Sequence, residues 1–191
     1  LNTAMTPELA RQLAPDAIVG AIGAGPIVPP IPGIGEGIVV PAVGMHEHMD
    51  RIGQTVVILG GGLVGCEEGI LLAQQGKQVT ILEMKPELCR DAPYLHHEAV
   101  LLELERLGAV TRVDTQCTQI LSDGVLAVCG GQEIRLPADT VLLAAGMRPR
   151  LEEAEAFRGC APEFWKIGDC KQARNVRLAI HEGYDAGAYL E

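Results

Sequence analysis

A glycine-rich turn between an apolar run and a helix-like segment constrains this chain most strongly. Residues 54–59 (QTVVIL) form the apolar run, and the glycines at 60, 62 and 65 fit the pattern G-x-G-x-x-G. A second apolar run, residues 78–82, ends on the acid Glu83, which lies 23 residues after Gly60. This order of strand, turn, helix, strand and acid is typical of a dinucleotide fingerprint, in which about 20 residues separate the turn from the acid.

Each part of this segment suits a task in holding a dinucleotide. Gly60 allows a tight turn, Gly62 lets the backbone approach a pyrophosphate, and Gly65 lets the helix pack closely on the strand. The helix N-terminus offers free N–H groups to phosphates, and we expect Glu83 to accept hydrogen bonds from the adenosine ribose. The alternative is a turn that only packs, which three consecutive glycines disfavour because each costs backbone entropy on folding.

The composition restricts the partners of this chain. Its 191 residues include 15 Lys and Arg against 25 Asp and Glu, a formal net charge of −10. That charge argues against nucleic acid and against an anionic membrane surface as partners. No apolar run approaches the ~18 residues of a membrane span, and no signal-peptide pattern is present, so we expect a cytoplasmic location. The chain begins at Leu1 rather than Met, which suggests a fragment or a processed product.

The six cysteines and five histidines predict no metal site. The closest cysteines are 10 residues apart and no C-x-x-C occurs, so we expect buried thiols rather than a dithiol, zinc or iron–sulfur centre. His46 and His48, or His96 and His97, lack further ligands at a suitable spacing, and we interpret them as solvated loop residues. The sequence indicates no catalytic side chain either.

The rest of the chain predicts an α/β fold with a Rossmann-like, three-layer parallel sheet. Residues 26–33 hold too many prolines for a helix interior or a central strand, so we interpret them as an extended crossover between two structural units. The glycine-punctuated strands between residues 110 and 136 predict a small antiparallel meander inserted in the sheet. Further helices are expected at residues 1–16, 63–75, 94–107 and 176–190, and further strands at 17–21, 38–42 and 140–144.

The order of motifs along the chain resembles the two-dinucleotide flavoproteins of the pyridine-nucleotide–disulfide-oxidoreductase superfamily. Besides the glycine turn with Glu67 and the strand that ends in Glu83, the motifs are PDAIVGAIG (15–23), PPIPG (29–33), LLAAGMRP (142–149) and IGDC (167–170). Residues 167–184 are similar, more particularly, to the C-terminal region of the enoate reductase and 2,4-dienoyl-CoA reductase type of NADH:flavin oxidoreductase.

In that family a barrel holds FMN and the organic substrate, an iron–sulfur cluster follows, and an NAD(P)H domain is inserted in an FAD domain. The resemblance implies that residues 51–147 are the NAD(P)H-binding domain. Residues 1–50 would be part of the FAD domain with the crossover, and residues 148–191 would return to the FAD domain and its C-terminal helix. The barrel, the cysteine cluster and the first FAD fingerprint are absent from this sequence, so FMN and the cluster would lie outside it and autonomous catalysis is not expected.

The resemblance also implies site residues. The pyrophosphate of NAD(P)H would lie against Gly60, Gly61, Gly62, Leu63, Val64 and Gly65. Glu67 would lie near the nicotinamide, Glu83 at the ribose and Gly146 beside the cofactor. On the flavin side, Gly168 and Asp169 would face the FAD ribityl chain and Gly23 would line the FAD site, where Ile22 replaces the usual threonine.

Structural alternatives exist for three of the charged residues. Glu67 could be a first-turn acid that satisfies the helix dipole. Asp169 could be a turn or capping residue. Arg148 is better explained by the shape of the chain before Pro149 than by phosphate binding.

The resulting hypothesis is an oxidoreductase module in which NADH passes hydride to FAD, with electrons continuing to an FMN-dependent reductase of enoate or enoyl-CoA type. NADH is expected rather than NADPH because Glu83 would repel a 2′-phosphate, an effect that Lys85 weakens. One alternative is a non-catalytic dinucleotide-binding or docking domain. Another is a disulfide or CoA-disulfide reductase whose dithiol lies outside this sequence.

Overall fold

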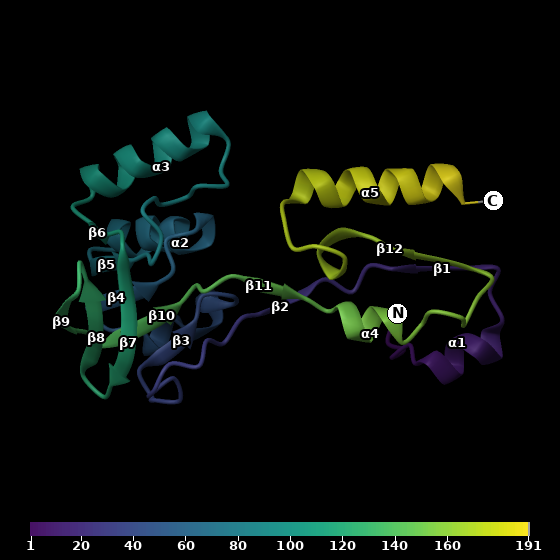
Figure 1. Cartoon of the computed structure of the whole chain (residues 1–191), viewed down its shortest axis with the longest axis horizontal. Coiled ribbons are helices and arrows are strands. Elements are labelled where there is room, and N and C mark those ends of the chain that lie inside the picture. Colours follow the sequence, from purple (N-terminus) through teal and green to yellow (C-terminus); the bar gives the residue numbers. More distant parts are fainter. Residues whose placement is uncertain (191) are drawn as a thin grey trace. The chain divides into compact units, whose positions relative to one another are not determined.

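The computed structural model describes residues 1–190, which divide into two compact units (Figure 1). Unit 1 combines Leu1–Gly25 with the chain from Met147 onward, and unit 2 comprises Pro26–Gly146. The polypeptide therefore leaves unit 1, builds all of unit 2 and returns. Strands β2 (Ala24–Pro26) and β11 (Met147–Pro149), where the chain passes between the units, pair with each other.

Unit 2 is built on a five-stranded parallel sheet in the order β3-β10-β4-β5-β6. Strand β4 pairs with β5 along its whole length and with β10 on its other side. The chain therefore moves outward from β4 to β5 and β6 and later returns to the opposite side of β4. This reversal creates a topological switch point at the carboxyl ends of β4 and β10, where open α/β sheets bind ligands. The strands are β3 (Val39–Pro41), β4 (Thr55–Leu59), β5 (Gln78–Leu82), β6 (Val110–Arg112) and β10 (Thr140–Leu143).

The core of unit 2 consists of two clusters, because the side chains of each strand point alternately to the two faces of the sheet. Val56 and Ile58 of β4 pack on one face of the sheet with helices α2 (Leu63–Gln74) and α3 (Tyr94–Arg106). Val57 and Leu59 pack on the other face. Because successive strand residues point to opposite faces, a continuously apolar strand indicates a sheet that is covered on both sides.

The second face of the sheet is covered by a three-stranded antiparallel meander. It consists of β7 (Thr115–Leu121), β8 (Gly124–Cys129) and β9 (Gln132–Pro137). Val125 and Ala127 of β8 are fully buried in the second cluster. The three-layer α/β fold is thus confirmed, but the meander forms its own sheet instead of being inserted in the parallel one. The pairing partners decide this. Strand β6 pairs with β5 of the parallel sheet, whereas β7, β8 and β9 pair only with one another.

Unit 1 joins segments from both ends of the sequence. Strand β1 (Ala17–Gly20) pairs in parallel with β12 (Glu163–Lys166), so that Ala17 lies opposite Glu163. Helix α1 (Pro7–Leu13) begins at Thr6, whose hydroxyl accepts a hydrogen bond from the Leu9 N–H at 3.2 Å, an N-cap of the expected kind.

The other elements of unit 1 follow β11. They are α4 (Leu151–Glu155), the 3₁₀ helix η2 (Gly168–Cys170) and α5 (Val176–Tyr189), which agrees with the predicted final helix. Among residues 1–190, no helix combines the length and the apolar character needed to cross a bilayer.

We predict that Gly65→Ala lowers the free energy of unfolding by about 1–3 kcal/mol. A Cβ atom at position 65 would lie 2.0 Å from the Gly60 carbonyl oxygen, so the helix or the turn must shift. Urea denaturation followed by far-UV circular dichroism measures the change. Gly35→Ala is the matched control in unit 2, because its Cβ would meet no atom within 4 Å. Equal stability of the two variants would contradict the proposed packing constraint.

Candidate functional site

The turn between β4 and α2 requires glycine at several positions. Gly60 has a φ of +115°, and a Cβ atom there would lie 2.3 Å from the Ala144 carbonyl oxygen. A Cβ at Gly61 would lie 2.2 Å from the end of the Leu88 side chain. The Gly60 contact brings the turn directly against the end of β10, which fixes where the N-terminus of α2 points.

Gly62 differs from its neighbours because it faces open space. It is the N-cap of α2 with φ −69° and ψ 179°, and a Cβ atom there would meet no protein atom within 4 Å. The first intrahelical hydrogen bond runs from the Cys66 N–H to the Gly62 carbonyl, 3.0 Å. No side chain caps the helix and its first turn holds no acid. The N–H groups of Leu63 and Val64 are thus offered to an external anion.

A cavity of about 570 Å³ opens in front of this turn, at the carboxyl ends of β4, β5 and β10. Its volume falls in the range of about 300–1,000 Å³ that is usual for small-molecule and cofactor sites. Of the residues expected at the site, Gly60, Gly62, Glu83 and Gly146 line it. The other lining residues are Pro29, Pro30, Ile31, Leu59, Leu82, Met84, Lys85, Asp91, Thr115, Gln116, Cys117, Ala144 and Ala145.

The proline-rich segment forms part of the cavity wall, a role that the sequence did not indicate. The Pro32 carbonyl accepts a hydrogen bond from the Ile120 N–H at 2.8 Å, and a Cβ at Gly33 would lie 1.9 Å from the Ile120 carbonyl oxygen. These contacts hold the segment against β7 of the meander. The crossover is therefore a structural component of unit 2, and the nearby Pro29 and Pro30 face the cavity.

Glu83 lies at the end of β5 with only 8% of its surface exposed. Its Oε2 accepts a hydrogen bond from the Gly61 N–H at 2.7 Å, and its Oε1 accepts one from the Lys85 N–H at 2.9 Å. The carboxylate thus ties the glycine turn to the end of the neighbouring strand, a role that sequence reasoning missed. Each oxygen can accept a further hydrogen bond, so Glu83 still suits the predicted contact with a ribose.

Glu67 lies in the second turn of α2, and it does not line the cavity. Its Oε1 lies 3.2 Å from Nε2 of His96 on α3, and half of its side chain is exposed. The interpretation of Glu67 as a first-turn acid is wrong, because the helix begins at Leu63. Its predicted place near a nicotinamide stays a prediction.

The histidines sit on helical segments, which corrects their interpretation as loop residues. His96 and His97 lie in the first turn of helix α3, which begins at Tyr94, and His46 and His48 lie in the 3₁₀ helix η1 (Met45–Arg51). The side chain of His97 is only 16% exposed and lies 3.2 Å from Oε1 of Glu98. Across residues 1–190, no group of three or more His, Cys, Asp or Glu side chains could hold a metal ion.

The cysteines are free, and all but the half-buried Cys129 are buried. The Cys66 thiol donates a hydrogen bond to the Gly61 carbonyl at 3.5 Å. Its interaction with Cys89, together with burial, raises the pKa of Cys66 and lowers that of Cys89. Both side chains belong to the buried core cluster of unit 2, so we assign them to packing.

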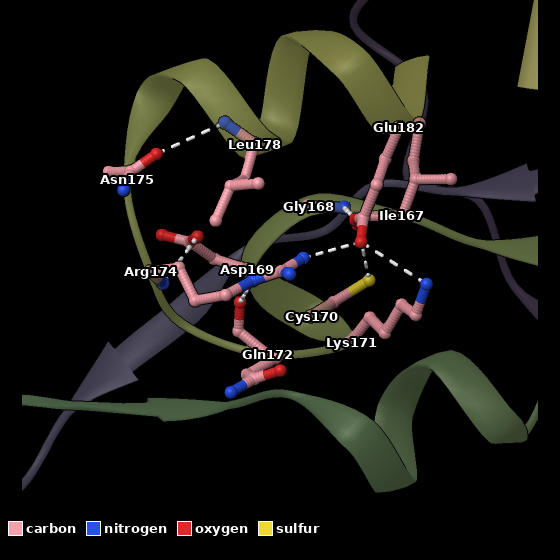
Figure 2. A network of polar contacts seen from close by, with 10 residues as sticks. All are labelled: Ile167, Gly168, Asp169, Cys170, Lys171, Gln172, Arg174, Asn175, Leu178 and Glu182. Atoms are coloured by element: carbon pink, nitrogen blue, oxygen red, sulfur yellow. Dashed lines mark hydrogen bonds and ion pairs between the residues drawn. The ribbon is translucent and has the colours of Figure 1, made fainter. Parts of the chain in front are cut away.

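The residues expected on the flavin side lie in unit 1, at the turn between β12 and α5 (Figure 2). Gly168 has a φ of +64°, and its N–H donates to Oε2 of Glu182 at 2.6 Å. Oδ1 of Asp169 accepts a hydrogen bond from the Arg174 N–H at 3.2 Å, which agrees with the alternative of a turn residue. Within residues 1–190 no hydrogen bond reaches its Oδ2, so the carboxylate keeps an acceptor that suits a flavin polyol.

Glu182 was not expected at this site. Lys171 Nζ lies 3.1 Å from its Oε1, and the Arg174 guanidinium donates to the same oxygen. Burial alone would raise the pKa of Glu182, but the hydrogen bonds from Arg174, Gly168 and Lys171 outweigh it and lower the pKa.

Within residues 1–190, Gly23, which was expected to line the flavin site, and Arg148, which was expected to shape the chain before Pro149, take part in none of the side-chain hydrogen bonds described above. Gly23 has a φ of +74° and no atom within 4 Å of the position of a Cβ, so its surface is open. Arg148 lies in β11.

Comparisons with known proteins give one consistent picture. The family described as "Pyridine nucleotide-disulphide oxidoreductase" matches residues 5–183. A bilirubin reductase of Mediterraneibacter gnavus is 32% identical over 177 residues, covering 92% of this chain and 28% of that protein. A cinnamate reductase of Clostridium sporogenes is 29% identical over 191 residues, covering 97% of this chain and 28% of that protein.

A solved structure extends this similarity to three dimensions. A 2-naphthoyl-CoA reductase in complex with 2-naphthoyl-CoA matches with a TM-score of 0.91 and 32% identity, over 100% of this chain and 29% of that one. The chain therefore spans less than a third of the length of each of these proteins.

We predict that Glu83→Ala lowers the free energy of unfolding by about 1–3 kcal/mol, because the Gly61 and Lys85 N–H groups lose their acceptor. Glu83→Gln should lose less, since its amide oxygen can still accept one of the two hydrogen bonds. Chemical denaturation checks both values. Equal stability of Glu83→Ala and the parent chain would refute the tethering role.

Proposed function

The chain belongs to the pyridine nucleotide-disulphide oxidoreductase family, and on that premise we propose that it is the NADH-binding module of a flavin-dependent oxidoreductase. The observation that carries the proposal is the uncapped N-terminus of α2. It opens through Gly62 onto a cavity that Glu83 also lines. These features suit a dinucleotide whose pyrophosphate lies on the turn and whose ribose lies at the acid.

In this proposal the residues of the chain bind and orient the cofactor. The pyrophosphate lies along residues 60–65, where the backbone is open at Gly62 and the Leu63 and Val64 N–H groups face it. Glu83 accepts hydrogen bonds from the adenosine ribose, and Gly146 lets the cofactor pass close to the end of β10. When bound, the nicotinamide and the flavin would supply the hydride-transfer chemistry. No side-chain acid or base is required for that step, and none is assigned.

The proposed domains are an NADH domain inserted in an FAD domain. Residues 51–147 would bind NADH, and residues 1–50 and 148–191 would belong to the FAD domain. The change of unit between Gly146 and Met147 supports the second boundary. The structure also gives Pro26–Asp50 to unit 2, since β3 joins its sheet, so this part of the first segment would support the NADH domain.

The final electron acceptor is proposed from the relatives. One is named cinnamate reductase and another 2-naphthoyl-CoA reductase, which supports a reductase of enoate or enoyl-CoA type as the whole protein. Its FMN and iron–sulfur cluster would lie outside this chain. The second candidate is a binding or docking domain without turnover, which is favoured by the fact that all residues lining the cavity belong to unit 2.

Thermal unfolding with NADH, NADPH and FAD, each added separately, tests the proposal. NADH at about 100 times its dissociation constant should add about 2.7 kcal/mol of stability, or roughly 5–10 °C in the melting temperature. Gly62→Ala should fold normally, because its Cβ meets no protein atom, yet lose most of the NADH shift because the methyl group blocks the pyrophosphate.

Gly35→Ala is again the control, since it also adds a methyl group in open space but lies outside the proposed site. It should keep the full NADH shift. A parent chain that responds to neither nicotinamide cofactor, or a Gly62→Ala variant with an unchanged shift, would contradict the proposed site.

Cofactor preference should depend on Glu83. We expect the parent chain to bind NADH more tightly than NADPH, and Glu83→Gln to reduce that preference roughly tenfold by removing one charge-assisted hydrogen bond and the repulsion of the 2′-phosphate. Calorimetric titration with both cofactors measures the ratio. Lys85→Gln should shift the preference further toward NADH. An unchanged ratio in Glu83→Gln would remove Glu83 from the ribose site.

A further inference from the structure

Glu182 on α5 binds three groups of the turn that precedes this helix, 8 to 14 residues earlier in the sequence. Its Oε2 accepts the Gly168 N–H at 2.6 Å, while its Oε1 accepts from Lys171 Nζ at 3.1 Å and from the Arg174 guanidinium (Figure 2). The side chain is only 16% exposed. A carboxylate that is largely removed from water needs such donors to stay ionised, so Glu182 and the turn depend on each other.

The same turn is fixed from the other side by β1. The Ile167 N–H donates to the Gly20 carbonyl at 3.0 Å, and the Cys170 thiol donates to the same carbonyl at 3.0 Å. Helix α5 itself is capped by Asn175, which accepts the Leu178 N–H at 3.1 Å. Residues 167–174 are therefore held at both ends, and Glu182 supplies the contacts in between.

Arg174 contacts two carboxylates, those of Asp169 and Glu182. The Arg174 backbone N–H already binds Asp169 Oδ1 at 3.2 Å, so its guanidinium is tethered near that carboxylate. In the structure the guanidinium binds Glu182 instead. Opposite charges a few ångströms apart attract strongly where water is partly excluded. Without Glu182, Arg174 would be free to pair with Asp169 and occupy the oxygen that a ligand needs.

We propose that Glu182 is a positioning residue of the flavin site, which holds the Gly168 turn and keeps Arg174 away from the Asp169 carboxylate. The ligand class is the polyol chain of a flavin, whose hydroxyl groups donate to Asp169. The inference rests on the proposed function only in taking FAD as the ligand of unit 1. Nothing in it depends on the cavity of unit 2.

FAD titration of the 191-residue chain, followed by quenching of Trp165 fluorescence, tests this role. Trp165 is the single tryptophan and lies in β12, three residues before Gly168. Glu182→Gln keeps an acceptor for the Gly168 N–H but releases the two cations, and it should weaken FAD binding roughly tenfold. The double variant Glu182→Gln/Arg174→Ala should regain most of the lost affinity, because the competing cation is gone.

The matched control is Glu155→Gln. Glu155 is also in unit 1 and accepts from Arg158 at 2.6 Å and from Lys166, so the variant loses a carboxylate with two cationic partners at another place. It should bind FAD as the parent does. A second readout needs no flavin. Glu182→Ala should speed hydrogen exchange at the Gly168 amide, measured by NMR, while Glu182→Gln should change it little.

Three results would overturn the inference. If Glu182→Gln bound FAD as tightly as the parent chain, Glu182 would have no positioning role in the flavin site. A double variant weaker than Glu182→Gln would show that Glu182 only stabilises the turn, because loss of a second partner would then add to the damage. A parent chain that binds no FAD would remove the flavin ligand of unit 1, whereas the NADH shift tests unit 2 separately.

Discussion

The approach of the Gly60 backbone to the Ala144 carbonyl is the contact on which unit 2 depends. A Cβ would lie 2.3 Å from that oxygen, so β4, its turn and the end of β10 can meet only at a residue without a side chain. Gly65 repeats the constraint one helical turn later, against the Gly60 carbonyl. Together they fix helix α2 on the sheet and aim its N-terminus at the cavity. Gly62, which packs against nothing, is left open for a ligand.

Both candidate sites share one physical device, a carboxylate that accepts the N–H of a glycine. Glu83 holds Gly61 at 2.7 Å, and Glu182 holds Gly168 at 2.6 Å. In each case the glycine belongs to a turn that follows a strand, and the acid comes from another element. Such charge-assisted hydrogen bonds are stronger than neutral ones. They can fix a flexible turn without placing a side chain in the space that a cofactor needs.

The sequence predicted those features that depend on local pattern. The glycine spacing, the apolar run of residues 140–144 and the motif order predicted the parallel sheet and the family, and both are confirmed. Contacts between distant segments were not predictable in this way. Examples are the proline segment against Ile120, the Glu83 tether and the separate meander. Glu182 lies only 14 residues after Gly168, but nothing in the residue pattern around either one indicates the hydrogen bond between them. The place of Glu67 and Gly146 relative to a cofactor stays a prediction.

The pairing of β1 with β12 also bears on the order in which the chain folds. Ala17 and Glu163, which lie opposite each other, are 146 residues apart in the sequence. Closing so long a loop costs conformational entropy, and contacts of high sequence separation form slowly. Unit 2 can complete its own sheet from a continuous segment and bring residues 25 and 147 together as it does so. During synthesis β1 therefore stays unpaired until unit 2 has folded and β12 has been made. We expect the β1–β12 pair to be the last parallel pairing to form.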